Sequence, residues 1–174
     1  MKITILDKAK KKKFIAGLTN LGIKKIPQLL IRTGKERVRA YSGNLSKEEI
    51  MNLWHVLPFE GIGLYVGKDF ISRSGVREVR LSIDGMHTWK DQLEGNIVVL
   101  TEKQEAVWFR GKNIELSAEQ TNGMTGFVSV KSACTARCTP HAAGVTSSDF
   151  VGVGKIGNDG ILYGFLPKER RRRN

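Results

Sequence analysis

The chain has 174 residues, which suits one domain or two small ones, and 40% of them are hydrophobic, enough to bury a core. No stretch approaches the roughly 18 consecutive apolar residues that a membrane span needs, and residues 1–7 have the pattern of a strand rather than a signal peptide, so we expect a cytoplasmic protein. Lys and Arg total 29 against 17 Asp and Glu, a net charge of +12, which favours a polyanionic partner because cations that meet phosphates release condensed counterions.

The positive charge is distributed unevenly along the chain. Residues 1–92 hold 18 basic and 9 acidic side chains, whereas residues 93–174 hold 11 and 8. The two stretches also differ in the secondary structure that their patterns predict. We therefore expect two modules, one over residues 1–92 and one over residues 93–174, with the stronger positive field on the first.

Residues 1–92 show the pattern of a mixed α/β domain. Apolar residues recur at helical spacing between Phe14 and Leu21, and Ser46 with Glu49 forms a capping box ahead of a second helix. The predicted elements, in chain order, are a strand over 2–6, a helix over 9–21, strands over 28–33 and 37–41, a helix over 47–55, and strands over 61–68 and 78–83.

Residues 93–174 show the pattern of a nearly all-β module. Many short strands with glycine-rich turns indicate a small barrel, so the whole chain is predicted to be α+β. The predicted elements are a strand over 97–101, a short helix over 103–109, and strands over 126–131, 149–156 and 161–166, the last two joined by a turn at Asn158, Asp159 and Gly160.

The end of the short helix carries the first candidate binding residues. Arg110 and Lys112 stand on either side of Gly111, so two cations can pair with phosphates while the glycine admits a sugar or a base edge. Trp108 and Phe109 precede them. Aromatic residues in such a position are more often core than stacking platforms, and we expect at least one of the two in the core.

A second candidate lies in the segment Val151-Gly-Val-Gly-Lys-Ile156. Gly152 and Gly154 can permit close approach of a phosphate, with Lys155 supplying a charge, or they can simply relieve crowding inside a barrel strand. The segment is no dinucleotide fingerprint, because the third glycine and the following helix are missing. With no catalytic motif or methyl-donor site elsewhere, we predict no enzyme and no cofactor.

Two further basic segments are candidates. Arg37 and Arg39 alternate on one face of a predicted strand, within the basic first 40 residues. The tail from Lys168 to Arg173 contains Arg170 and Arg171, and it is either an arm that clamps RNA or a disordered terminus.

The two cysteines lie in a predicted loop over residues 132–148 that is rich in Ser, Thr and Ala. Cys134, Cys138 and His141 lack an obvious fourth ligand, so no metal site is predicted. A disulfide, two free thiols and a bound metal are all compatible with this spacing.

Several of these segments resemble the PUA domain. Val107-Trp-Phe-Arg-Gly111, Phe127-Val-Ser-Val130 and Asp149-Phe-Val-Gly-Val-Gly-Lys155 resemble its short helix ending at a glycine and its later strand with two glycines. Gly160-Ile-Leu-Tyr-Gly-Phe-Leu-Pro-Lys-Glu-Arg170 resembles the end of the PUA-like domain attached to the Sun/Fmu family of rRNA cytosine-5 methyltransferases, of which standalone archaeal relatives are ribosome biogenesis proteins.

The first half resembles the pre-PUA domain of a eukaryotic and archaeal 60S-biogenesis factor. The matching segments are Leu29-Leu-Ile-Arg32, Val38-Arg-Ala-Tyr41, Lys47 to Leu53, Gly63-Leu-Tyr-Val-Gly-Lys68 and Val79-Arg-Leu-Ser-Ile83. The methylase core of the Sun/Fmu enzymes is absent, and the cysteine-bearing loop departs from the family pattern.

The resemblance implies an RNA-binding protein of rRNA maturation, ribosome biogenesis or tRNA maturation. Its partner is then structured RNA, gripped by the glycine-bearing helix end and the neighbouring strand, which places Arg110, Gly111, Lys112, Gly152, Gly154 and Lys155 at the contact. The alternative is an adaptor that docks a separate RNA methyltransferase or assembly factor, with RNA contact secondary.

Overall fold

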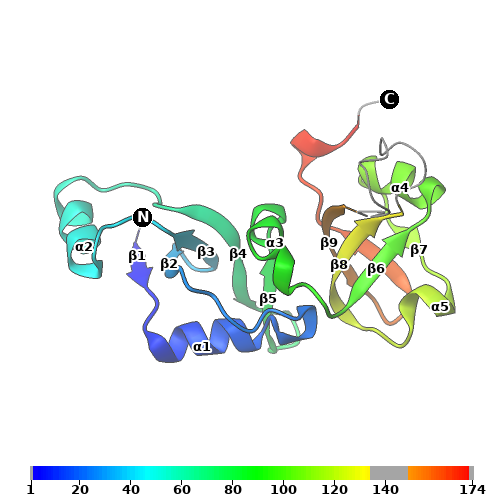
Figure 1. Ribbon diagram of the computed structural model, residues 1–174, viewed down its shortest axis with the longest axis horizontal. Helices are drawn as coiled ribbons and strands as arrows, with labels where there is room; N and C mark the ends of the chain where they lie inside the picture. The colour runs from blue at the N-terminus through cyan, green and yellow to red at the C-terminus, as the bar shows by residue number, and fades with distance from the viewer. Residues whose placement is uncertain (1, 134–148, 173–174) are drawn as a thin grey trace, which may run out of the picture. The chain divides into compact units, whose positions relative to one another are not determined.

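A computed structural model of the chain describes residues 2–133 and 149–172 (Figure 1). The chain divides into two compact units. The first unit comprises Met1–Thr19 and Ile23–Trp89, and the second comprises Asn20–Gly22 and Lys90–Asn174. Each unit contains one five-stranded sheet, so the protein is mixed α/β with two separate sheets.

The first unit is an antiparallel sheet in the order β1-β2-β3-β4-β5, with helices on both faces. Its strands are β1 (Ile3–Ile5), β2 (Leu29–Thr33), β3 (Arg37–Tyr41), β4 (Leu64–Ile71) and β5 (Arg77–Leu81), and its helices are α1 (Lys8–Ala16), α2 (Lys47–Val56) and α3 (Ile83–Thr88). Consecutive strands are neighbours throughout; tight turns join β2 to β3 and β4 to β5, whereas the connections from β1 to β2 and from β3 to β4 contain α1 and α2.

The two faces of this sheet are covered by different helices. Ile5 and Ile31 pair across β1 and β2, and on their face α2 buries Ile50 against them. On the opposite face, α1 approaches β5 so closely that a Cβ atom built on Gly17 would lie 2.5 Å from Cγ2 of Val79. The second face, which we call the α1 face, therefore needs a small residue where the helix ends.

The sequence predicted most of these elements but misplaced several of their ends. The capping box of Ser46 and Glu49 is present and opens α2 as predicted. The first helix was predicted to run to residue 21; it ends at Ala16, and a short 3₁₀ turn follows at Thr19–Leu21. Helix α3 was missed, because Ser82 accepts from the backbone of Gly85 and caps a helix where a strand was expected to continue.

The second unit contains a curled half-barrel sheet in the order β6-β8-β9-β10-β7. Its strands are β6 (Ile97–Leu100), β7 (Ile114–Glu115), β8 (Gly126–Ser132), β9 (Phe150–Ile156) and β10 (Ile161–Gly164), and its helices are α4 (Glu102–Phe109) and α5 (Ala118–Thr121), with a 3₁₀ turn at each end of the unit (Lys90–Gln92 and Lys168–Arg170). β6 pairs with β8 in parallel and all other pairs are antiparallel.

The core of the second unit forms around one indole ring. Trp108 on α4 is 1% exposed and packs with Val128, Val130 and Leu162. Glycines provide the space: a Cβ atom on Gly152 would lie 2.6 Å from the ring. Trp108 is thus core, as expected for at least one of the two aromatic residues at this helix end.

The second unit also contains elements that the sequence did not predict. β7 and α5 were missed, because one is two residues long and the other four. Two capping boxes, Thr101 with Gln104 and Ser117 with Gln120, open α4 and α5, and the two glutamine side chains hydrogen-bond each other. In the described part of the chain, no helix is both long and apolar enough to cross a bilayer.

Candidate nucleic-acid interface

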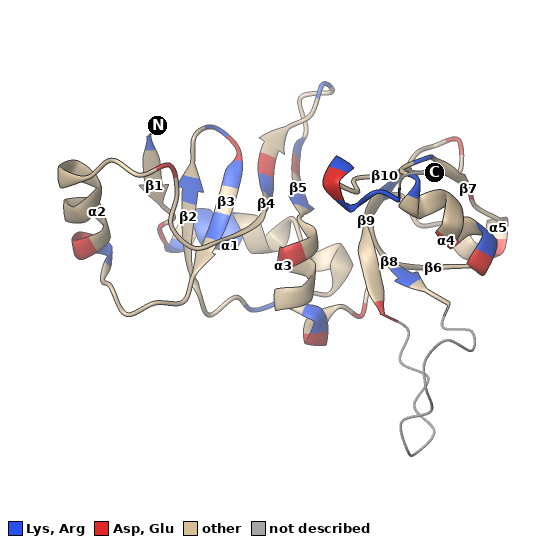
Figure 2. Ribbon diagram, turned by 90° about the horizontal axis from the view of Figure 1, so that it is seen from above, with Lys and Arg blue, Asp and Glu red and all other residues tan. Residues whose placement is uncertain are grey.

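Lys and Arg positions are spread over both units (Figure 2), and each unit offers one candidate group for an anionic partner. In the second unit, two segments about 60 positions apart in sequence meet at the end of α4. We call this group the C-terminal arginine cluster; it consists of Arg110, Lys112, Arg170, Arg171 and Arg172. In the first unit, basic residues line a pocket on the α1 face, which we call the Asp69 pocket; its lining is Lys10, Lys13, Arg32, Lys35, Glu36, Asp69, Phe70, Ile71 and Arg77.

The C-terminal arginine cluster is held by contacts between the tail and α4. The backbone N–H of Arg172 donates to the carbonyl of Phe109 at 2.7 Å, and the Arg172 guanidinium lies 4.9 Å from the centre of the Phe109 ring. Nε of Arg171 donates to the carbonyl of Leu166 at 3.1 Å. Residues 168–172 are thus docked, so the tail is not a disordered terminus up to Arg172.

Gly111 makes this docking possible. Its φ angle is +71°, a left-handed conformation that favours glycine, and a Cβ atom there would lie 2.4 Å from Nε of Arg171. The predicted role of Gly111 was to admit RNA. The structure fills that space with the chain's own tail, so the glycine acts here through the position of Arg171.

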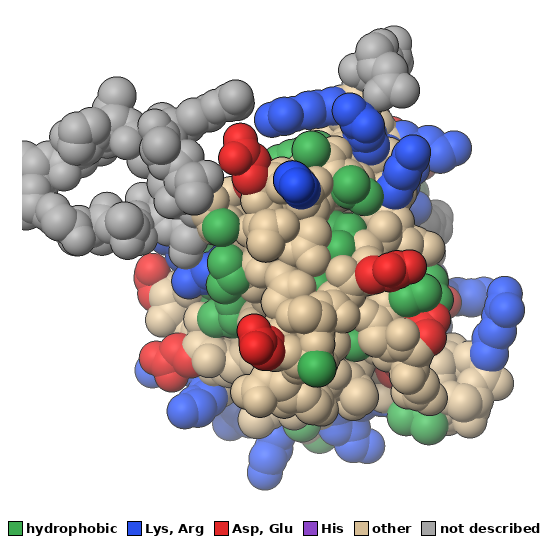
Figure 3. All heavy atoms as spheres, turned by 90° about the vertical axis from the view of Figure 1, so that its right-hand side faces the viewer, with side chains coloured by type: hydrophobic (Ala, Val, Ile, Leu, Met, Phe, Trp, Pro, Cys, Tyr) green, Lys and Arg blue, Asp and Glu red, His purple; other side chains and the backbone are tan. Residues whose placement is uncertain are grey.

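The remaining cations of the cluster face solvent. Arg110, Lys112 and Arg170 are exposed, and Arg110 is the C-cap of α4. Cations at a helix C-terminus are stabilised by the partial negative charge of its free carbonyls, which accounts for part of the clustering. Figure 3, which views the end of the second unit with α4 and α5, shows Lys and Arg gathered at its upper edge, while acidic side chains are spread over the face.

Gly152 and Gly154 do not form an open surface on the side where a Cβ atom would point. Both are buried in β9, and a Cβ on Gly154 would lie 2.5 Å from Cδ1 of Leu162, as one on Gly152 would meet Trp108. Their small size serves the packing of the barrel interior, which was the second of the two interpretations that the sequence allowed. Contact of these two glycines with RNA stays a prediction.

Lys155 is half-buried on β9, and its ammonium lies 5.2 Å from the centre of the Phe127 ring on the neighbouring strand β8. Lys131 makes a similar contact with Phe150, at 4.5 Å. Cations over aromatic faces are attracted by the ring quadrupole. The β8–β9 pair thus carries two lysines supported by aromatic rings.

Arg37 and Arg39 lie on one face of β3, as their alternation predicts, and they belong to the first unit. Arg37 is exposed and pairs across the sheet with Lys68. Arg39 is half-buried, and its Nη1 donates to the carbonyl of Gly63 at 2.9 Å. Arg37 is therefore available to a ligand, whereas Arg39 fixes the chain that enters β4.

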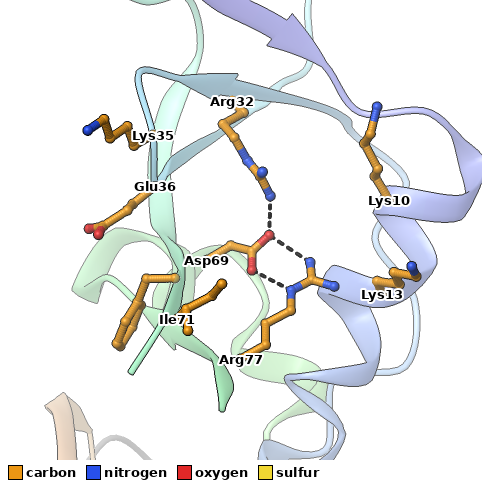
Figure 4. Close-up of a pocket in the computed structure, with 9 residues that line it drawn as sticks. Lys10, Lys13, Arg32, Lys35, Glu36, Asp69, Ile71 and Arg77 are labelled. Atoms are coloured by element: carbon orange, nitrogen blue, oxygen red, sulfur yellow. Dashed lines mark hydrogen bonds and ion pairs between the residues drawn. The ribbon is translucent and has the colours of Figure 1, made fainter. Parts of the chain in front are cut away.

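The Asp69 pocket centres on a buried carboxylate (Figure 4). The Asp69 side chain is 3% exposed and accepts two hydrogen bonds from Arg77, from Nε and Nη2, each at 2.7 Å. It also accepts from Nη2 of Arg32. The hydrogen bond to Asp69 raises the pKa of Arg77. One carboxylate on β4 thus fixes two guanidinium groups, one from β2 and one from β5.

Three lysines complete the pocket, which has a volume of about 520 Å³. Lys10 and Lys13 of α1 line it, as does Lys35 from the β2–β3 turn (Figure 4). Glu36 also lines the pocket and accepts from Lys68 at 3.2 Å. The pocket is therefore rich in cations, as a site for anions would be.

The basic residues of α1 and β2 stand out in the sequence, whereas Asp69 and Arg77 were not predicted as site residues. The sequence did contain a signal for Asp69. Strand alternation places its side chain on the same face of the sheet as Gly67 and Ile71, and Val79, its partner on the neighbouring strand, is buried on that face. A carboxylate at an inward position requires a partner. That partner could not be named without the sheet register.

The predicted motif of Cys134, Cys138 and His141 lies outside the described residues. Over residues 2–133 and 149–172, no group of three or more His, Cys, Asp or Glu side chains could hold a metal ion.

Comparison with family models finds no match, and a search of the curated proteins finds none either.

Proposed function

We propose that this protein binds structured RNA and acts in ribosome biogenesis or tRNA maturation, with a pre-PUA-like first unit and a PUA-like second unit. The observation that carries the proposal is the C-terminal arginine cluster, in which residues 110–112 and 170–172 meet at one helix end. The cluster contains five cations from two short segments. Such convergence of like charge is unfavourable in isolation and becomes favourable when phosphates occupy it.

The fold is compatible with this assignment. The second unit is a curled sheet with one parallel pair, and its short helix ends at a glycine with positive φ. The PUA family that the sequence resembles binds structured RNA with a helix end of this kind. Arg110 and Lys112, which the resemblance places at the contact, are exposed, so an RNA backbone can reach them.

The experiment that tests the proposal is a salt titration of binding to transfer RNA and to ribosomal RNA fragments, with the full chain. We expect the logarithm of the affinity to fall steeply between ~50 and ~200 mM salt, because each phosphate contact releases counterions. Arg110→Ala with Lys112→Ala should weaken binding and lower the slope of that plot by about 2, one for each lost contact.

The matched control is Lys90→Gln with Lys103→Gln, which also removes two exposed charges from the second unit, at sites away from the helix end. This variant should retain the slope to within about 0.5. The proposal fails if purified protein binds neither RNA in dilute buffer. An equal loss in both double variants would show that net charge, rather than the cluster, drives binding.

A second candidate function is that of an adaptor for an RNA-modifying enzyme or assembly factor. The observation that favours it is an apolar surface at the end of α2, where Leu53, Val56 and Leu57 are 41%, 84% and 66% exposed. Exposed apolar side chains grouped in this way are typical of protein-binding surfaces. RNA affinity that stays flat between ~50 and ~200 mM salt would favour the adaptor.

A further inference from the structure

We propose that the Asp69 pocket binds a terminal phosphate group, the monoester found at the 5′ end of an RNA or on a free nucleotide. For the RNA source, the inference rests on the proposed function; for a free nucleotide it does not. Nothing in the C-terminal arginine cluster is needed for it, because the pocket lies entirely within the first unit.

The two arginines of the pocket are already oriented. The Asp69 carboxylate accepts hydrogen bonds from Nε and Nη2 of Arg77. These two bonds fix the guanidinium group and leave its Nη1 for another acceptor. Arg32 donates one hydrogen bond to Asp69, from Nη2, and the Nε of Arg32 is buried without a hydrogen-bond partner among the described residues. Guanidinium groups held in place lose little freedom when they bind a phosphate, which favours a ligand with several oxygen acceptors.

The charge of the pocket favours a doubly ionised phosphate. Five cationic side chains line the pocket against two carboxylates, and one of these, Glu36, is paired with Lys68. The excess is suited to a terminal phosphate, which carries roughly −1.5 to −2 charges at neutral pH. A phosphate within an RNA backbone carries one.

The shape of the site favours a phosphate at a chain end. Its lining comes from three directions, namely α1, the β2–β3 hairpin and the β4–β5 hairpin, and the nearly buried Asp69 forms part of it (Figure 4). A phosphate at a chain end enters such a pocket more easily than one with nucleotides on both sides. Ile71, 72% exposed on the rim, provides an apolar contact for the attached nucleoside.

A purely structural role for the network explains only part of it. Arg32, Asp69 and Arg77 tie β2, β4 and β5 together, and that alone would suffice to bury the carboxylate. It does not explain why α1 adds two further cations, Lys10 and Lys13, to the lining that already contains the two arginines. Lys10 has an exposed pair with Asp7 at 3.0 Å, which offsets little of the repulsion. An anion in the pocket accounts for all the cations together.

The test compares two fluorescent RNA oligonucleotides of one sequence, one with a 5′-phosphate and one with a 5′-hydroxyl, on the full chain. Competition by 5′-AMP, with adenosine as reference, separates the free nucleotide from the RNA end. The key variant is Lys10→Gln with Lys13→Gln, since both residues are exposed and leave the buried network intact. The matched control is Lys8→Gln with Lys12→Gln, from the same helix but outside the pocket lining.

We expect the wild-type chain to bind the 5′-phosphorylated RNA about tenfold more tightly, in keeping with charge-assisted hydrogen bonds to a terminal phosphate. In the key variant this preference should fall below about threefold, and in the control variant it should remain. The Nε–H signal of Arg77 in an NMR spectrum should shift on addition of 5′-AMP and stay in place with adenosine.

The outcomes are distinguishable. Preference for 5′-phosphate RNA without competition by 5′-AMP assigns the site to RNA ends, whereas an Arg77 shift with 5′-AMP and no RNA preference assigns it to free nucleotides. Equal binding of both RNAs together with an unmoved Arg77 signal overturns the proposal. If RNA binding fails altogether, the 5′-AMP titration still decides the pocket, so the proposed function and this inference can fail separately.

Discussion

The two basic groups of this protein hold their arginines by different means. In the Asp69 pocket, a buried carboxylate fixes Arg32 and Arg77. In the C-terminal arginine cluster, Arg171 and Arg172 contact backbone carbonyls and an aromatic ring. The first arrangement ties cations to the stability of a sheet, because removing the carboxylate leaves charges in a partly desolvated place.

The second arrangement costs the fold little. Arg110 and Lys112 are exposed at the end of α4, where their charges are hydrated and screened, and Arg170 is exposed in the tail. The comparison teaches that the same residue type can be part of the folded framework in one unit and a removable surface feature in the other. Substitutions should therefore affect stability in the first unit and RNA affinity in the second.

The largest expected effect is that of Asp69→Asn, which keeps the shape of the side chain and removes its charge. We expect a loss of roughly 3 kcal/mol in unfolding free energy, at the low end for a broken buried pair because both arginines are partly exposed. Urea denaturation measures it. Glu36→Gln, which breaks the exposed pair with Lys68, is the control and should cost less than about 0.5 kcal/mol.

Similar losses in these two variants would mean that the buried carboxylate is no more important than a surface one. The arginines of the first unit would then contribute no more to stability than the exposed ones of the second unit.

The next effect concerns the support beneath the C-terminal arginine cluster. Gly152→Ala places a Cβ atom against the ring of Trp108, so we expect overpacking to cost about 2 kcal/mol. Thermal unfolding measures the loss. Below the melting temperature, RNA affinity should stay within about twofold of wild type, because Gly152 is a packing residue. A large loss of affinity in a folded variant would restore the RNA-contact interpretation of this glycine.

The smallest expected effect is that of Phe109→Leu. It keeps an apolar side chain but removes the ring beneath Arg172, which costs about 0.5–1 kcal/mol for an exposed cation–π contact. Differential scanning calorimetry can detect that change, and RNA affinity should fall less than in the Arg110 and Lys112 double variant. A loss of unfolding free energy as large as that of Asp69→Asn would mean that docking of the tail is essential to the stability of the second unit.

Local signals in the sequence predicted much of the fold. The capping box at Ser46 and the hairpin strand over residues 37–41 depend on side chains a few positions apart, and both are found where expected. The parallel pairing of β6 with β8 joins segments about 30 residues apart, and no local pattern encodes it. The first helix was predicted too long because apolar spacing continues past Gly17, whereas the helix ends at Ala16 with Gly17 as its C-cap.

The candidate sites divide in the same way. Arg110, Lys112 and the tail arginines could be selected from charge and resemblance, because exposed cations need no partner to be identified. The Asp69 pocket could not, because Arg32, Asp69 and Arg77 come from three strands whose register only folding sets.

The sequence by itself determined the net charge, the alternation of most strands and the helix caps, since each depends on residues near one another in the chain. The tertiary structure decided which glycines pack against core side chains, which arginines share a carboxylate, and that the tail contacts Gly111. These depend on distances between remote segments, which are fixed by burial of the core and pairing of the sheets.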